Sequence, residues 1–138
     1  MDVNIYLSFD GRCAEAFDFY ARVLGGTVEA KHTWSETPQA GDMPPDYRDK
    51  IMHAQLRVAG KLIMGADAPP QWRSKPEGFS VSVNVEDEAE GKRAFEALAE
   101  GGEVKMPFGP TFWAKGFGML VDRYEIPWMV NAQPAASG

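Results

Sequence analysis

The sequence predicts an α+β fold built from two βαβββ modules whose mixed sheets curl into open cups. The main observation is a repeat: a strand pattern, an acidic turn and a helix that stops at Gly-Gly occur in residues 5–28 and again in residues 81–104. A second observation is that residues 69–78 contain three prolines and have the composition of a linker. We therefore expect modules at residues 1–68 and 79–133, followed by a frayed tail at residues 134–138.

The first module is expected to begin with a strand over residues 3–9, because apolar and polar residues alternate there with period two. A helix follows up to Leu24, and Gly25-Gly26 ends it. The next strand is expected over residues 27–34. The acidic residues around the helix start are expected to be capping and solvated charges: Asp10, Glu15 and Asp18.

A long loop is expected over residues 35–49, where three prolines and Gly41 argue against regular structure. Loops of this length are often lids or binding loops, and a surface excursion is the alternative. Alternation resumes over residues 51–58, and Gly60 predicts a tight hairpin into residues 61–66.

The second module repeats this order. A strand is expected over residues 79–85, and the acidic run Glu86-Asp87-Glu88 marks a helix start. Gly101-Gly102 ends that helix. The three remaining strands are expected over residues 104–108, 117–121 and 127–131.

Composition excludes several classes of protein. The chain has 138 residues, a formal net charge of −6 and one cysteine, Cys13. It has no signal-peptide pattern and no apolar run of membrane-spanning length, so we expect a cytoplasmic protein that binds neither nucleic acid nor membrane. Cys13 lies at a predicted helix start, where the dipole could activate the thiol, but a buried inert thiol is the favoured interpretation.

The pattern resembles the vicinal oxygen chelate superfamily, which includes glyoxalase I, extradiol dioxygenases and bleomycin resistance proteins. Residues 6–11, 16–20 and 51–54, together with Thr111-Phe112-Trp113, Phe117-Gly118, Asp122 and Ile126-Pro127-Trp128, are similar to the PhnB-like branch, often labelled a 3-demethylubiquinone methyltransferase domain. The resemblance implies a glyoxalase-like fold over nearly the whole chain. One departure is Glu125, where that branch usually has glycine, and it makes a tight left-handed bend there less expected.

The resemblance also implies four metal-ligand positions on the first and last strand of each module. They fall at Asn4, Met64, Ser80 and Met129. None is an anionic or imidazole ligand, and a one-residue slip gives Ile5, Ile63, Val81 and Trp128, so we expect no metal.

His53 is expected on the polar face of its strand, beside Gln55 and Arg57. It could be a general base, because an unperturbed histidine titrates near pH ~6.5, or a hydrogen-bonded structural residue. Other polar residues could orient a ligand: Asn4, Tyr6, Ser80, Ser82 and Asn84. Larger side chains could line an apolar cavity or simply form core: Met64, Trp113, Met119 and Met129.

Two functions remain open. One is a metal-independent small-molecule binder, expected to be a homodimer because open sheets leave edges that one small chain does not cover. The other is an enzyme, a lyase, isomerase or transferase, with His53 as its base. The sequence lacks a Gly-rich nucleotide loop, a GxSxG elbow and a Cys-His zinc pattern, so no cofactor is expected.

Overall fold

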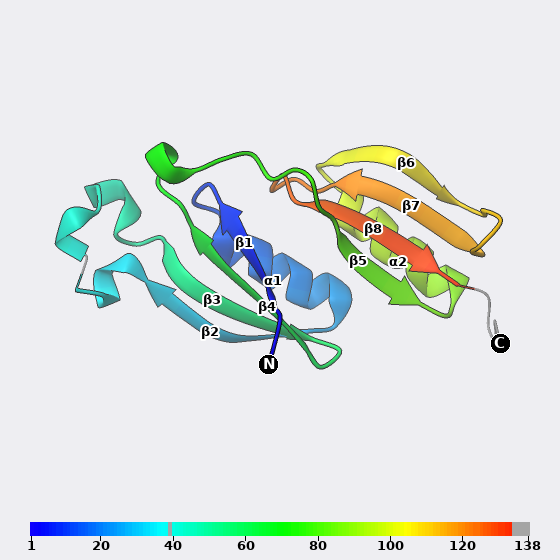
Figure 1. Ribbon diagram of the computed structural model, residues 1–138, viewed down its shortest axis with the longest axis horizontal. Coiled ribbons are helices and arrows are strands. Elements are labelled where there is room, and N and C mark those ends of the chain that lie inside the picture. The colour runs from blue at the N-terminus through cyan, green and yellow to red at the C-terminus, as the bar shows by residue number, and fades with distance from the viewer. Residues whose placement is uncertain (39, 134–138) are drawn as a thin grey trace. The chain divides into compact units, whose positions relative to one another are not determined.

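The computed structural model describes residues 1–38 and 40–133, so the expected tail at residues 134–138 lies outside the described residues. The chain divides into two compact units, Met1–Ser74 and Lys75–Gly138. Each unit contains one four-stranded mixed sheet and one α-helix (Figure 1). In the described part of the chain, neither α-helix is long and apolar enough to cross a membrane.

The first unit contains β1 (Ile5–Phe9), α1 (Cys13–Leu24), β2 (Thr27–Thr33), β3 (Ile51–Val58) and β4 (Lys61–Asp67). The strands lie in the order β1-β4-β3-β2. β1 runs parallel to β4, whereas β3 is antiparallel to both β2 and β4. A parallel pair needs a long connection, and here α1, β2 and β3 lie between β1 and β4 in sequence.

The second unit has the same plan. It contains β5 (Val81–Val85), α2 (Glu88–Ala99), β6 (Glu103–Gly109), β7 (Gly116–Val121) and β8 (Pro127–Ala132). Its strand order, β5-β8-β7-β6, matches the first unit position by position, again with the first and last strands parallel. The predicted pair of βαβββ modules is therefore confirmed. The expected first strands were too long, because β1 begins at Ile5 and Val3 is 89% exposed, and β5 begins at Val81 rather than Phe79.

The two glycines of each Gly-Gly helix stop have different roles. The first glycine takes a left-handed conformation, with φ of 71° at Gly25 and 77° at Gly101. The second glycine lets the next strand approach its neighbour closely. A Cβ on Gly26 would lie 2.7 Å from the Arg57 carbonyl oxygen, and one on Gly102 would lie 2.3 Å from that of Val121.

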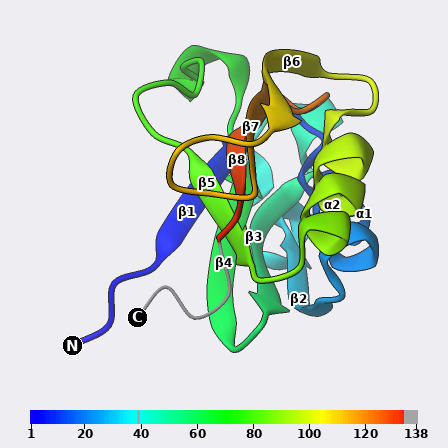
Figure 2. The same cartoon turned by 90° about the vertical axis from the view of Figure 1, so that its right-hand side faces the viewer.

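Each helix covers one face of its own sheet, which places the core of each unit between them (Figure 2). In the first unit, Phe17 of α1 is fully buried and packs over Gly65, where a Cβ would lie 2.8 Å from the ring. In the second unit, Phe95 of α2 has the same role over Gly118, where a Cβ would lie 2.6 Å from the ring. We call the opposite face of each sheet its open face.

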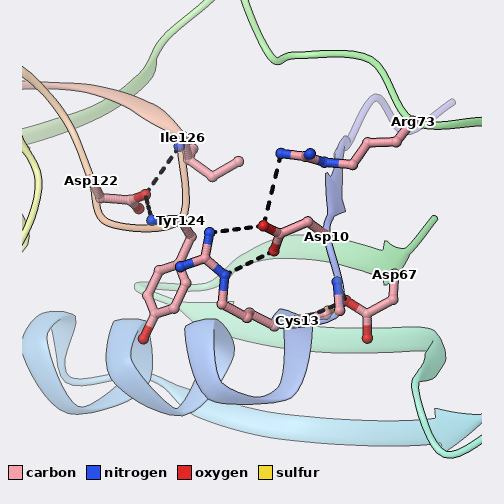
Figure 3. A network of polar contacts seen from close by, with 9 residues as sticks. Asp10, Cys13, Asp67, Arg73, Asp122, Tyr124 and Ile126 are labelled. Carbon is pink, nitrogen blue, oxygen red and sulfur yellow. Dashed lines mark hydrogen bonds and ion pairs between the residues drawn. The ribbon is translucent and has the colours of Figure 1, made fainter. Parts of the chain in front are cut away.

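The start of α1 is held by a residue far away in sequence. Asp67 at the end of β4 accepts hydrogen bonds from the backbone N–H groups of Gly11, Cys13 and Ile51, at 2.9, 2.9 and 2.8 Å. Figure 3 shows Asp67 beside Cys13. The cap is therefore a residue that the sequence analysis did not name, while Glu15 lies in the first turn of α1 as expected. The N-cap residue, Arg12, makes no side-chain cap bond.

The acidic residues near the start of α1 have other surroundings. Asp10 pairs with Arg12 at 2.8 Å, and Asp18 pairs with Lys31 at 2.8 Å. Both are local charge pairs on the surface of the first unit, and they leave the helix start to Asp67.

The segment between β2 and β3 is more regular than expected. It forms three 3-10 turns, Trp34–Glu36, Ala40–Asp42 and Pro45–Tyr47. Backbone bonds close its two ends, from Trp34 N–H to the Lys50 carbonyl at 3.0 Å and from Ser35 N–H to that of Arg48 at 2.9 Å. Met43 and Tyr47 are buried, so the segment packs as part of the protein and is not a solvated excursion.

Candidate functional site

The open face of the first unit is defined by the register of β1, β4 and β3. Tyr6 pairs with Met64, and Met64 pairs with Gln55, so these three side chains lie in one row across the sheet. Because side chains alternate along a strand, His53 lies on the same face as Gln55. The sequence-based prediction that Tyr6, His53, Gln55 and Met64 share a surface agrees with this register.

Three of these side chains form a hydrogen-bonded chain. The Tyr6 hydroxyl lies 3.1 Å from His53 Nδ1, and the Gln55 amide nitrogen lies 3.1 Å from His53 Nε2. The rings of Tyr6 and His53 are 5.8 Å apart and tilted by 35°. Both nitrogens of His53 are therefore engaged by side chains of its own unit.

The orientation of the Gln55 amide determines which nitrogen of His53 carries the proton. When the Gln55 amide N–H donates to Nε2, the imidazole proton lies on Nδ1 and is donated to the Tyr6 oxygen. The Tyr6 O–H then points its proton elsewhere. With the Gln55 amide turned over, every donor and acceptor in the chain reverses, and Tyr6 donates to His53.

Tyr6 is 48% exposed, yet partial burial is the main cause that raises its pKa, and Cys13 adds to the effect. A raised pKa keeps the phenol protonated at neutral pH. Tyr6 is thus a neutral hydrogen-bonding group at the open face. The only cysteine is itself fully buried, and burial followed by the nearby Asp67 charge raises the pKa of the Cys13 thiol, which supports the inert interpretation.

The remaining residues of the first unit that the sequence analysis placed near the site lie outside the Tyr6-His53-Gln55 hydrogen-bonded chain. Asn4 is exposed and precedes β1, and the direct neighbour of Met64 on β1 is Tyr6. Arg57 donates to Glu29 at 2.8 Å, so its guanidinium is held by β2. Asn4 and Arg57 are therefore not part of the Tyr6-His53-Gln55 chain.

The open face of the second unit carries different side chains. Ser82 pairs with Met129, and Asn84 pairs with Asn131. The Asn84 side-chain oxygen accepts from both Ser82 and Asn131, each at 3.5 Å. Ser80 lies just before β5 and outside this row.

Trp113 belongs to an aromatic group on the second unit. Its ring lies 5.3 Å from Phe117 and 4.9 Å from Phe112, edge to face in both cases. Phe117 is the β7 partner of Asn131 in the register. Met119 is the β7 partner of Met129, so the aromatic and thioether side chains border the polar row.

The donors at the positions implied for a metal do not fit a divalent ion. The four implied positions hold one amide, one hydroxyl and two thioethers: Asn4, Ser80, Met64 and Met129. The strand register places two more neutral hydroxyls, those of Tyr6 and Ser82, beside the two methionines. Over residues 1–38 and 40–133, no three side chains of His, Cys, Asp or Glu converge closely enough to hold a metal ion. We derive no chemistry through a metal.

Sequence reasoning missed two polar residues. Asp67 and Asn131 are both buried, at 1% and 8% exposure, and each ends or nearly ends the last strand of its unit. A polar residue in an apolar strand was the available signal. The partners of these side chains lie on other strands, and no local pattern identifies them.

The paired βαβββ units, each with one four-stranded mixed sheet and one α-helix, define a glyoxalase-like fold. A glyoxalase-related enzyme from Fulvimarina pelagi aligns with 96% of this chain and 88% of its own, with a TM-score of 0.66 and 16% identity, which concerns the fold alone.

Sequence similarity identifies one family among the proteins that share this fold. The family model described as 3-demethylubiquinone-9 3-methyltransferase matches residues 1–131, and the chain belongs to that PhnB-like family. Protein YjdN of Escherichia coli K12 is 37% identical over 141 residues, covering 95% of both chains. The crystal structure of PA1353 from Pseudomonas aeruginosa is 46% identical, with a TM-score of 0.88 and coverage of 97% and 98%.

Proposed function

We propose that this chain binds a small apolar or aromatic molecule on the open face of its first unit, without a metal ion. The observation that carries the proposal is the Tyr6-His53-Gln55 hydrogen-bonded chain, which lies beside Met64. Small-molecule sites commonly combine an apolar lining with a few placed polar groups. Asn4 at the edge of this face is a further candidate contact.

Among the three hydrogen-bonded side chains, Tyr6 is the one that contacts the ligand. His53 has both nitrogens engaged, so it acts through Tyr6 by fixing where the phenol proton lies. A thioether beside the phenol gives an adaptable apolar wall. Such a surface suits a flat molecule with one oxygen or nitrogen that hydrogen-bonds to Tyr6.

Metal independence is supported by donor chemistry. A bound divalent ion must replace its water shell with anionic or imidazole ligands, and the aligned positions offer neutral hydroxyl, amide and thioether groups. We expect elemental analysis after dialysis to find less than one tightly held ion per chain. One ion per chain that is lost in Asn4→Ala would overturn this part of the proposal.

A methyl transfer is not favoured, although the family model carries that name. The chain has no Gly-rich strand-to-helix loop with an acidic partner for a ribose. The enzymatic alternative that one observation does favour is proton transfer. With the Gln55 amide turned over, its oxygen accepts from Nε2–H, and Nδ1 accepts from the Tyr6 hydroxyl. In that orientation the 3.1 Å contact gives a proton path from a ligand through Tyr6 to His53 as the base.

A thermal-shift screen of the purified protein against metabolites and divalent metals tests the binding proposal, because a ligand of the folded state raises stability. For a hit, Tyr6→Phe should weaken affinity about threefold to tenfold, the effect of one hydrogen bond. His53→Gln should also weaken it, because the variant removes the imidazole that holds the Tyr6 hydroxyl in place.

His32→Gln is the matched control. His32 is the β2 partner of His53 in the register, but its ring lies near Glu36 and outside the Tyr6 chain. It should leave affinity unchanged. A large fall in melting temperature for His53→Gln, with affinity unchanged, would make His53 structural and remove the enzymatic alternative.

We also propose a cytoplasmic homodimer. Support comes from β6, an edge strand on which Val104 and Met106 are 46% and 44% exposed, and from Phe112 at 97% exposure. Exposed apolar edges of this kind are commonly covered by a second copy. Light scattering at micromolar concentration should give about twice the 15.2 kDa of one chain, and a monomer mass would refute the dimer.

A further inference from the structure

The peptide bond between Asp10 and Gly11 joins two residue types that rearrange readily to isoaspartate. Asp-Gly occurs once in the sequence, and Asn-Gly does not occur in it. Glycine favours this rearrangement because no side chain shields its nitrogen from the neighbouring carboxyl group. The turn between β1 and α1 nevertheless requires that glycine, since Gly11 has a φ of 104°, a conformation that other residues rarely adopt.

The rearrangement needs water and no other reactant. The Gly11 nitrogen loses its proton and attacks Asp10 Cγ, so that a C–N bond forms, a C–O bond of the carboxyl group breaks and water leaves. Water then adds to the main-chain carbonyl of the cyclic imide and breaks the original C–N bond. The chain now runs through the Asp10 side chain, and the former main-chain carbonyl is a free carboxylate. The backbone has become one carbon atom longer.

The folded structure occupies the attacking nitrogen. Gly11 N–H donates to Asp67 Oδ1 at 2.9 Å, and Cys13 N–H donates to the same oxygen at 2.9 Å. Removing the Gly11 proton would place a second negative charge beside the Asp67 carboxylate, which opposes the attack. Asp67 is 1% exposed, so water competes little for its oxygen. The nitrogen is released only when the start of α1 separates from the end of β4.

The carboxyl group that would be attacked is held as well. Asp10 Oδ1 accepts from Arg12 Nε at 2.8 Å, and Oδ2 accepts from Arg12 Nη2 at 2.9 Å. Arg73 Nη2 lies 3.9 Å from Asp10 Oδ2 (Figure 3). The hydrogen bond from Arg12, together with the two arginine charges, lowers the pKa of Asp10. An ionised carboxylate reacts poorly here, because its oxygen leaves as water only after protonation.

We propose that Asp10-Gly11 is a latent isoaspartate site, which Asp67 keeps unreactive while the start of α1 stays in place. Opening of the helix start frees the Gly11 nitrogen for attack. The product cannot return to the native arrangement, because the longer backbone displaces the Gly11 and Cys13 N–H groups relative to Asp67. An opening that leads to rearrangement is thus recorded permanently in the chain. This site does not depend on the binding function proposed above.

Incubation in water labelled with heavy oxygen, followed by digestion in ordinary water, tests the proposal, because hydrolysis of the imide adds a label at Asp10. The tryptic peptide of residues 1–12 carries Asp10 and an internal control, Asp2, whose neighbour Val3 has a branched side chain. Fragment mass spectra locate the label and identify isoaspartate. Folded wild-type protein should rearrange at least about tenfold more slowly than the same protein unfolded in guanidinium chloride. Equal rates would overturn the proposal.

Asp67→Asn assigns the protection to one side chain. An amide of the same shape cannot accept from all three backbone N–H groups, so this variant should rearrange at least about threefold faster than wild type under conditions where circular dichroism shows both to be folded. Arg12→Gln frees the Asp10 carboxylate but leaves the Gly11 N–H bound, and it should have a smaller effect. Asp87→Ala removes the cap of the other helix and should have none. No acceleration in Asp67→Asn, or a larger one in either other variant, would refute the role of Asp67.

Discussion

The two units share strand order, helix position and paired glycines, yet they differ in the side chains that hold the helix start and that cover the open face. In the first unit the start of α1 is held by Asp67 from β4, whereas in the second α2 is capped locally by Asp87, which accepts from Glu90 N–H at 3.2 Å. The open faces carry a Tyr-His-Gln chain in one unit and a Ser-Asn-Asn row in the other. Backbone requirements are thus repeated, while ligand-facing chemistry is specific to each unit.

The largest expected change in the free energy of unfolding distinguishes the cap of α1 from the cap of α2. Asp67→Ala leaves three backbone N–H groups without their acceptor, those of Cys13 and Ile51, which are buried, and that of Gly11, which is partly buried. The variant should lower the free energy of unfolding by about 4 kcal/mol. Asp87→Ala removes one exposed cap bond and should cost about 1 kcal/mol. Urea unfolding of both variants measures the difference, and equal losses would show that the two helix starts are held equally.

The next effect tests the glycines that the two units have in common. Gly102→Ala should cost about 3 kcal/mol and Gly26→Ala about 2 kcal/mol, because the added Cβ would meet a backbone oxygen at 2.3 and 2.7 Å. Gly109→Ala and Gly41→Ala are controls, since nothing lies within 4 Å of a Cβ there. Controls that destabilise as much as the two test variants would disprove the close-approach explanation.

A smaller gain is expected at two residues with positive φ. Ala59, at φ 50°, precedes Gly60 in the β3–β4 turn, and Glu125, at φ 71°, lies in the β7–β8 turn. The bend that Glu125 made less expected is therefore present. Ala59→Asn and Glu125→Gly should each raise the free energy of unfolding by about 0.5–1 kcal/mol, because these residues accept left-handed geometry more readily. Thermal unfolding that shows a loss at either site would contradict this.

The smallest effect concerns acid stability and belongs to the first unit. A hydrogen bond from Arg12, with its charge and that of Arg73, lowers the pKa of Asp10 from its ordinary value of 3.8. A lowered carboxyl pKa stabilises the fold above the unfolded value, and the contribution is lost as pH falls below about 4. Asp10→Asn should flatten the fall in melting temperature in that range and change little at neutral pH. An unchanged acid limb would mean that the pair adds nothing measurable.

Sequence predicted those parts of the fold that local patterns determine. Alternation, helical spacing and the Gly-Gly stops located both modules. They also assigned Tyr6 and Gln55 to the polar faces of their strands, whereas the row that joins them through Met64 follows from the strand register. It did not predict that Asp67 caps a helix more than fifty positions earlier, because that contact exists only after β4 pairs with β1. It also chose Ser80, which lies just before β5 and outside the polar row. It missed Asn131, because only the strand register identifies this residue as the β8 partner of Asn84.

Because Cys13 is buried, the rate at which a reagent labels its thiol measures local opening of the first unit. A thiol reagent in solution cannot reach this sulfur while the start of α1 stays packed, and the raised pKa slows reaction further. Since the sequence holds one cysteine, the rate of labelling measures openings around that residue alone. Labelling in the presence of a bound molecule would then show whether that molecule stabilises the first unit, without a fluorophore or an engineered site.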